Sequence, residues 1–271
     1  MNGASREALA AARERLDALT DSTSVDAGSL AEELASVTAL LHREVSLRRV
    51  LTDPAQDGGA KADLVQRLLG SQLSGSAADL VSGMVRSRWS QPRDLVDALE
   101  ELADLADLTA AQQAGALDSV EDELFRFGRI LSANNDLRAA LTDRKATAPA
   151  KSELLDSLLG RRANATTARL VTRLVSAPRG RSLEAGLQSL SKLAADRRNR
   201  MVAVVTSAVP LSDPQKQRLG AALAKLYGRT MHLNLDVDPA VVGGMRVQVG
   251  DEIINGSLAD RLEDASRRLA G

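Results

Sequence analysis

The helical part of this sequence repeats itself after 90 residues, and this repeat restricts the possible folds more than any other feature. Short groups of residues recur at that one spacing: Leu51-Thr52-Asp53 as Leu141-Thr142-Asp143, Lys61 as Lys151, and Leu68-Leu69-Gly70 as Leu158-Leu159-Gly160. After a slip of two residues, Leu95, Leu99, Leu102 and Leu105 match Leu183, Leu187, Leu190 and Leu193. Leucine-rich helices can align by chance, but a fixed offset that also keeps a Thr-Asp turn and a lysine favours duplication.

Two copies with so long a period indicate two packed helical bundles in series rather than a solenoid. In the first copy, apolar residues recur every three or four positions in stretches that begin at capping residues such as Ser5 and Ser29 and stop before Pro54. We therefore predict a first helical bundle over residues 1–107 and a second over residues 108–198. Residues 104–117 either extend the last helix of the first copy or form the first helix of the second, and the sequence leaves both open.

From Asn199 the pattern changes to short strands. Residues 201–205 form a continuous apolar run, and residues 231–237 alternate between apolar and polar side chains, with a helical pattern between them. Residues 245–249 and 253–254 are predicted to form a hairpin, and a last helix is expected from Ser257. The predicted fold class is mostly α: two tandem helical bundles from an internal duplication, followed by a small α+β domain (β-α-β-β-α) over residues 199–271.

Composition excludes several functions. Lys and Arg number 35 against 36 Asp and Glu, so the net charge gives no reason to expect nucleic-acid binding. The chain has no cysteine, which excludes disulfides and thiol chemistry and is typical of a cytoplasmic protein. Residues 1–20 lack an unbroken apolar core, so neither a signal peptide nor a membrane span is expected there.

No active site can be found in the sequence. His42 and His232 stand without a second histidine or cysteine at metal-ligand spacing, and no Ser-His-acid grouping or phosphate-binding glycine motif is present. Acid pairs such as Glu100-Glu101 are interpreted as solvated helix faces. The basic runs Arg161-Arg162, Arg179-Gly180-Arg181 and 197–200 could meet an acidic partner. We predict no catalytic residue, no cofactor and no metal.

The stretch from Gly243 to Leu262 carries the most specific pattern. A glycine pair, a strand, a turn, a second strand and a helix start follow one another directly. The residues singled out as structural or docking positions are Gly243, Gly244, Arg246, Val247, Gly250, Asp251, Ile254, Gly256, Ser257, Arg261 and Leu262. Together with the preceding residues 235–242, this block resembles the C-terminal motif of the delta subunit of the rotary ATP synthase, whose mitochondrial counterpart is the oligomycin sensitivity-conferring protein.

The resemblance implies a non-catalytic stator connector of a proton-translocating ATP synthase. Its implied partners are the N-terminal helices of the alpha subunits, which the bundle holds, and the C-terminal helix of the stalk subunit b, with the beta subunit as a further neighbour. No nucleic acid or small-molecule substrate is implied. The expected location is the cytoplasmic face of the cell membrane, as a peripheral protein attached only through the complex.

This chain departs from the family in having two bundles where members usually have one. Which copy receives the alpha subunit is therefore open, and our hypothesis is that the second copy keeps the usual arrangement while the first is additional. Two other classes remain. One is an unrelated soluble adaptor that binds amphipathic helices in another complex, which the block at residues 243–257 disfavours. The other is an enzyme, which the missing motifs disfavour.

Overall fold

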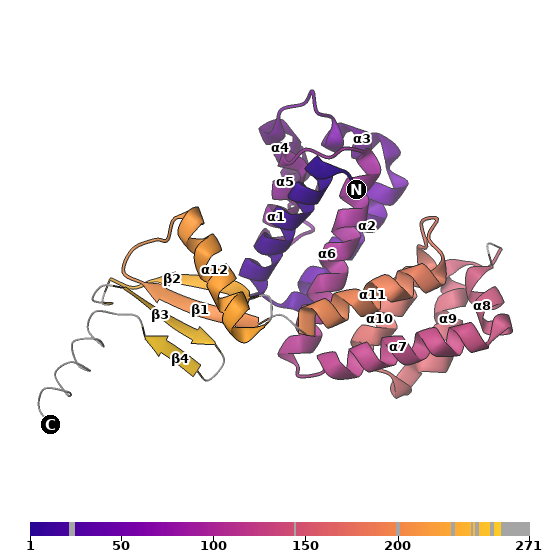
Figure 1. The fold of residues 1–271 in the computed structure, drawn as a ribbon. Helices are drawn as coiled ribbons and strands as arrows, with labels where there is room; N and C mark the ends of the chain where they lie inside the picture. Colours follow the sequence, from indigo (N-terminus) through magenta and orange to yellow (C-terminus); the bar gives the residue numbers. More distant parts are fainter. Residues whose placement is uncertain are drawn as a thin grey trace, which may run out of the picture. The chain divides into compact units, whose positions relative to one another are not determined.

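The computed structural model describes residues 1–21, 25–143, 145–198, 201–228, 231–239, 241, 244–249 and 252–255. The chain divides into two compact units, Met1–Arg197 and Arg198–Gly271, which are described separately (Figure 1). The first unit is helical and the second contains a small mixed sheet, so the predicted fold class is confirmed. Within the described ranges, no helix combines the length and the apolar character needed to cross a membrane.

The first unit contains two series of helices that match in length and position. Helices α1 to α6 span Gly3–Thr20, Ala27–Arg43, Val45–Thr52, Gly58–Leu69, Gly75–Arg86 and Pro92–Gln113. Helices α7 to α11 span Leu117–Ala133, Asn135–Thr142, Ala148–Leu159, Ala165–Ser176 and Leu183–Arg198, with a 3-10 turn at Gly160–Arg162. Adding 90 to both bounds of α2, α3, α4 and α5 gives the bounds of α7, α8, α9 and α10. The repeat in the sequence is therefore a repeat of helices.

Short polar contacts explain why particular residues recur. Thr52 and Thr142 each donate a hydrogen bond to the backbone carbonyl four residues earlier, at 2.8 and 2.7 Å, and so close the last turn of α3 and α8. Asp53 and Asp143 each accept a hydrogen bond from the backbone N–H two residues later, at 2.9 and 2.8 Å. Such aspartate contacts direct the chain into a turn. The Leu-Thr-Asp group thus ends one helix and begins the turn that follows it in both copies.

A glutamate binds the N-terminus of a helix in each of the two bundles. Glu33 on α2 accepts hydrogen bonds from the backbone N–H and the hydroxyl of Ser74, the residue before α5, at 2.9 and 2.7 Å. Glu123 on α7 accepts from the backbone N–H of Asn164, the residue before α10, and from the Thr167 hydroxyl, at 2.9 and 2.5 Å. A carboxylate near a helix N-terminus satisfies free N–H groups and is favoured by the helix dipole.

The buried side chains of this unit form two separate clusters, one for each bundle, and α6 belongs to both. Leu95, Leu99 and Leu102 lie in the first cluster, whereas Leu108 and Ala111 lie in the second. Adding 90 to the bounds of α1 gives residues 93–110, which fall inside α6. This helix is therefore the last helix of the first bundle and the first helix of the second, so both roles left open by the sequence apply. The predicted boundary between residues 107 and 108 falls within it.

The second unit contains β1 (Met201–Ser207), α12 (Asp213–Tyr227), β2 (Met231–Val237), β3 (Met245–Val249) and β4 (Glu252–Asn255). The strands lie in the order β2-β1-β3-β4; β1 pairs parallel with β2 and antiparallel with β3, and β3 and β4 form the predicted hairpin. Leu223 of α12 packs on a sheet face that includes Val205 and Val247. The helix predicted from Ser257 lies outside the described residues.

Candidate functional site

The family motif supplies structural residues of the small sheet. Gly244 precedes β3 with φ of 83°, a conformation that favours glycine. Val247 is buried and pairs with Ile254 on β4 and with Val205 on β1, whereas Arg246 is exposed. Gly243, Gly250, Asp251, Gly256, Ser257, Arg261 and Leu262 lie outside the described residues. A docking role for the motif stays a prediction.

A groove runs between α7 and α11 in the second bundle. Its volume is about 660 Å³, and Leu124 and Leu187 are among the apolar side chains that line it. Phe125 stands at the groove with 60% of its surface exposed, which is unusual for so large an apolar side chain. A Cβ atom added at Gly128, which also lines the groove, would meet no other atom within 4 Å. The groove is therefore open space with an apolar lining.

The repeat matches the two helices that border this groove, α7 and α11, with α2 and α6 of the first bundle. In the first bundle α2 and α6 pack directly against each other, and the fully buried Ala31 lies on α2. The residues 90 positions later than Ala31 and Ala35 are Glu121 and Phe125. Glu121 and Phe125 are longer than the alanines at the matching positions of α2, and packing as close as that of α2 against α6 leaves little room for them.

A second groove lies beside α1. Its volume is about 750 Å³, and its lining includes Ala4, Ala8 and Ala11 on the helix and Trp89 in the loop between α5 and α6. The Trp89 indole N–H donates to the backbone carbonyl of Met84 at 2.8 Å, which fixes the ring against the end of α5. Small side chains on α1 thus leave a shallow surface bordered by a rigid aromatic ring.

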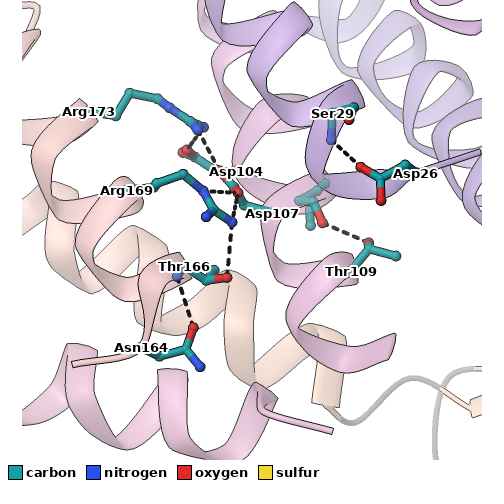
Figure 2. A network of polar contacts seen from close by, with 10 residues as sticks. Asp26, Ser29, Asp104, Asp107, Thr109, Asn164, Thr166, Arg169 and Arg173 are labelled. Atoms are coloured by element: carbon teal, nitrogen blue, oxygen red, sulfur yellow. Dashed lines mark hydrogen bonds and ion pairs between the residues drawn. The ribbon is translucent and has the colours of Figure 1, made fainter. Parts of the chain in front are cut away.

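Between α6 and α10 lies a network of charged side chains, shown in Figure 2. Arg173 donates to Asp104 at 2.8 Å and to Asp107 at 2.5 Å, and Arg169 donates to Asp107 at 2.9 Å. Asp107 is fully buried and Asp104 is 9% exposed. Burial raises the pKa of Asp104 to about 7; Arg173 acts against this rise and Asp107 adds to it. Two carboxylates of the shared helix are thus held by two arginines of the second bundle.

Further arginines of the second bundle meet carboxylates on α1 and α6. Arg181 donates to Glu100 at 2.5 Å, and Arg179 forms an ion pair with the same carboxylate. Arg197 pairs with Asp17 on α1 at 2.5 Å. The sequence interpretation of Glu100 as part of a solvated face is wrong, because its exposed fraction is only 4%. The basic runs at Arg179, Arg181 and Arg197 therefore contact acidic side chains of the same chain.

In the described part of the chain, no group of three or more His, Cys, Asp or Glu side chains could hold a metal ion. His42 is exposed, and its pKa is lowered by partial burial and by the positive charges of Arg179, Arg48 and Arg93. The described residues supply two grooves with apolar side chains in their lining and a junction of the two bundles that buried ion pairs hold together.

Comparison with known proteins gives consistent matches. The family model described as ATP synthase delta (OSCP) subunit matches residues 105–269. The ATP synthase subunit delta of Streptomyces coelicolor is 82% identical over 270 residues, covering 100% of this chain and 98% of that protein. The subunit delta of Thermobifida fusca is 46% identical over 271 residues and is covered completely, as is this chain. A chain in the structure of the Toxoplasma gondii mitochondrial ATP synthase hexamer matches 62% of this chain and 97% of its own length with a TM-score of 0.27 and 20% identity, values too low to support an argument.

Proposed function

Because the chain belongs to the ATP synthase delta (OSCP) subunit family, we propose that it is the stator connector that links the catalytic head of a proton-translocating ATP synthase to the peripheral stalk. It is a structural subunit of the ATP synthase complex and not itself an enzyme. The unrelated helical adaptor is thereby set aside. By holding the head against the torque of the rotor, the connector lets rotation drive ATP synthesis.

The extent of the family match carries the assignment of parts. The match begins at residue 105, close to the point where α6 passes from the first buried cluster to the second, and it runs through the second unit. This supports the hypothesis that the second bundle and the C-terminal unit form the usual connector and that the first bundle is additional. We assign the N-terminal helices of the alpha subunits to the bundles and the C-terminal helix of subunit b to the C-terminal unit.

The grooves suit such partners, because an amphipathic helix can lay its apolar face into an apolar groove. Several docked helices on one connector bind more tightly together than separately, since each bound helix raises the effective concentration of the next. The beta subunit is a further neighbour in this proposal, and the location is the cytoplasmic face of the cell membrane, reached through the complex. The proposal includes no nucleic-acid partner.

The test is titration calorimetry of the full chain with two probes, a peptide of the alpha-subunit N-terminus and a C-terminal fragment of subunit b. The variant Gly128→Leu places an apolar side chain in the groove between α7 and α11, at a position where no atom lies within 4 Å of the added Cβ. Ser119→Leu changes an exposed position on the same helix, outside the groove lining, and is the matched control. We expect wild type and Ser119→Leu to bind both probes, and Gly128→Leu to lose the alpha peptide alone.

Each other outcome has a definite meaning. If Gly128→Leu binds the alpha peptide as wild type does, that helix docks elsewhere, and the groove beside α1 is the next surface to fill. If the folded wild type binds neither probe, the proposed function is wrong. Deletion of residues 1–107 is a poor substitute, because it cuts α6 between the two buried clusters and removes the carboxylates that pair with Arg169 and Arg173.

A further inference from the structure

Three buried carboxylates lie along one side of α6, and we call them and their arginines the α6 ladder. Glu100, Asp104 and Asp107 follow one another at spacings of four and three residues, which places them one helical turn apart on one face. Their exposed fractions are 4%, 9% and 0%. Each faces at least one arginine of the second bundle. The ladder therefore concentrates like charges in a place that water hardly reaches.

The arginines compensate the three carboxylates unequally. Asp107 is held by both Arg169 and Arg173, and Glu100 is held by Arg181 and by Arg179. Asp104 has only Arg173, at 2.8 Å, and shares it with Asp107. A buried charge is costly unless paired. Asp104 is therefore the member of the ladder for which loss of the charge costs least.

Most other charged side chains around Asp104 are paired with groups other than Asp104. A cavity of about 210 Å³ beside it is lined on the α11 side by Ser189 and leucines. Arg93 and Asp97, which also line the cavity, approach each other at 3.6 Å. Glu101 is engaged by Arg13 of α1. Arg181 lines the same cavity but donates to Glu100. Met1, which carries the α-amino group, also lines the cavity, whereas the arginines there each contact another carboxylate.

We propose that the α6 ladder is a proton-linked clamp, which holds the second bundle against the shared helix more firmly when Asp104 carries a proton than when Asp104 is charged. The inference concerns the internal stiffness of the chain. It does not depend on which partners the connector binds.

The sign of the effect follows from the two states of the junction. In the closed junction burial raises the pKa of Asp104 to about 7. When α10 separates from α6, Asp104 meets water and its pKa returns to the ordinary value of about 3.9. The closed state thus binds the proton more tightly, and the stabilisation present at acid pH is lost as the pH rises through 7. Between pH of about 6 and about 8, the equilibrium constant for opening should rise about tenfold.

The first bundle provides an internal control. The positions 90 residues before Arg169 and Arg173 are Asp79 and Gly83 on α5, so α5 cannot form the same ladder with α1. Asp79 is instead 66% exposed and approaches Arg15 only to 3.9 Å. A pH effect on α10 that is absent from α5 would therefore report on the ladder.

The experiment is amide hydrogen exchange of the full chain at pH of about 6, 7 and 8, with rates corrected for intrinsic exchange. We expect opening in residues 165–176 to rise about tenfold across this range relative to residues 75–86. Asp104→Asn, which keeps an acceptor for Arg173 but no charge, should remove the pH dependence. The control Asp79→Asn should keep the wild-type profile.

The proposal is overturned if the exchange ratio of α10 to α5 is the same at every pH, or if Asp104→Asn keeps the wild-type profile. A direct measurement guards against misfolding of the variant. The carboxyl carbon resonance of Asp104 in the wild type should titrate with a midpoint near 7. A midpoint near the ordinary aspartate value of about 4 would equally overturn the proposal.

Discussion

Replacing Arg173 with methionine tests how strongly the junction of the two bundles depends on charge pairing. Arg173 is 17% exposed and donates to both Asp104 and Asp107. Methionine keeps an unbranched apolar stem and removes the charge. Asp107 retains Arg169, but Asp104 is left buried without an arginine. Removing one partner of a buried ion pair costs about 3–5 kcal/mol, and the retained Arg169 places our expectation at about 3 kcal/mol at pH of about 8.

The double variant Arg173→Met with Asp104→Asn separates the lost attraction from the penalty of an unpaired charge. The amide that replaces the Asp104 carboxylate carries no charge, so most of the penalty should disappear. We expect the double variant to recover about 2 kcal/mol relative to Arg173→Met alone, which is a coupling energy typical of side chains in direct contact. At pH of about 6 the cost of Arg173→Met should be smaller, because Asp104 is then largely protonated.

The assay is urea denaturation followed by two signals. Circular dichroism reports all the helices, and the fluorescence of Trp89 reports the first bundle, because this is the single tryptophan and is only 7% exposed. We expect Arg173→Met to lower the midpoint of both signals, since α6 belongs to both buried clusters. Costs that simply add in the double variant would refute the pairing argument. An unchanged Trp89 transition would refute the coupling of the two bundles.

Three further predictions use the repeat or the motif. Glu33→Ala and Glu123→Ala should each cost about 1–2 kcal/mol by freeing the N-terminus of the following helix, measured as faster exchange of the first amides of α5 and α10; equal protection in variant and wild type would contradict this. Leu34→Ala and Leu124→Ala, both at fully buried positions, should each cost about 3–5 kcal/mol in chemical denaturation, and a cost below about 1 kcal/mol would contradict the assigned cores. Gly244→Val should destabilise the second unit by about 1–3 kcal/mol because φ is 83°, and unchanged exchange of the β1 amides would count against it.

The fold was predictable from the sequence because its local signals agree. The same Thr-Asp group ends α3 and α8, as the repeat predicts. The single helix expected from Ser29 to this group is wrong, because the chain divides it at Glu44 into α2 and α3. Ser212 and Gln215 form a capping box at the start of α12, and Gly228 ends that helix with φ of 65°. Signals of this kind depend only on neighbouring residues, which is why they can be read without a structure.

The grooves and the ladder could not be predicted, because they depend on residues far apart in the chain. Arg173 and Asp107 are separated by 66 positions, and nothing in either local sequence pairs them. A signal did exist in hindsight: acids at 100, 104 and 107 share one helix face, and so do arginines at 169 and 173. The sequence alone makes such a stripe look solvated. In the structure the three acids are buried, because helices of both bundles cover α6.

The first bundle, which we propose is the additional one, shares α6 with the second bundle. A module attached by a flexible linker could turn independently of the rest of the connector and would transmit little torque. Here α6 runs from Pro92 to Gln113 with no glycine and no further proline, so the backbone offers no hinge between the bundles. Arg173 and Arg197 hold the second bundle to α6 and α1, which opposes rotation about the helix axis. In the proposed connector, a partner bound to the first bundle would therefore load the second bundle through α6 and the ion pairs.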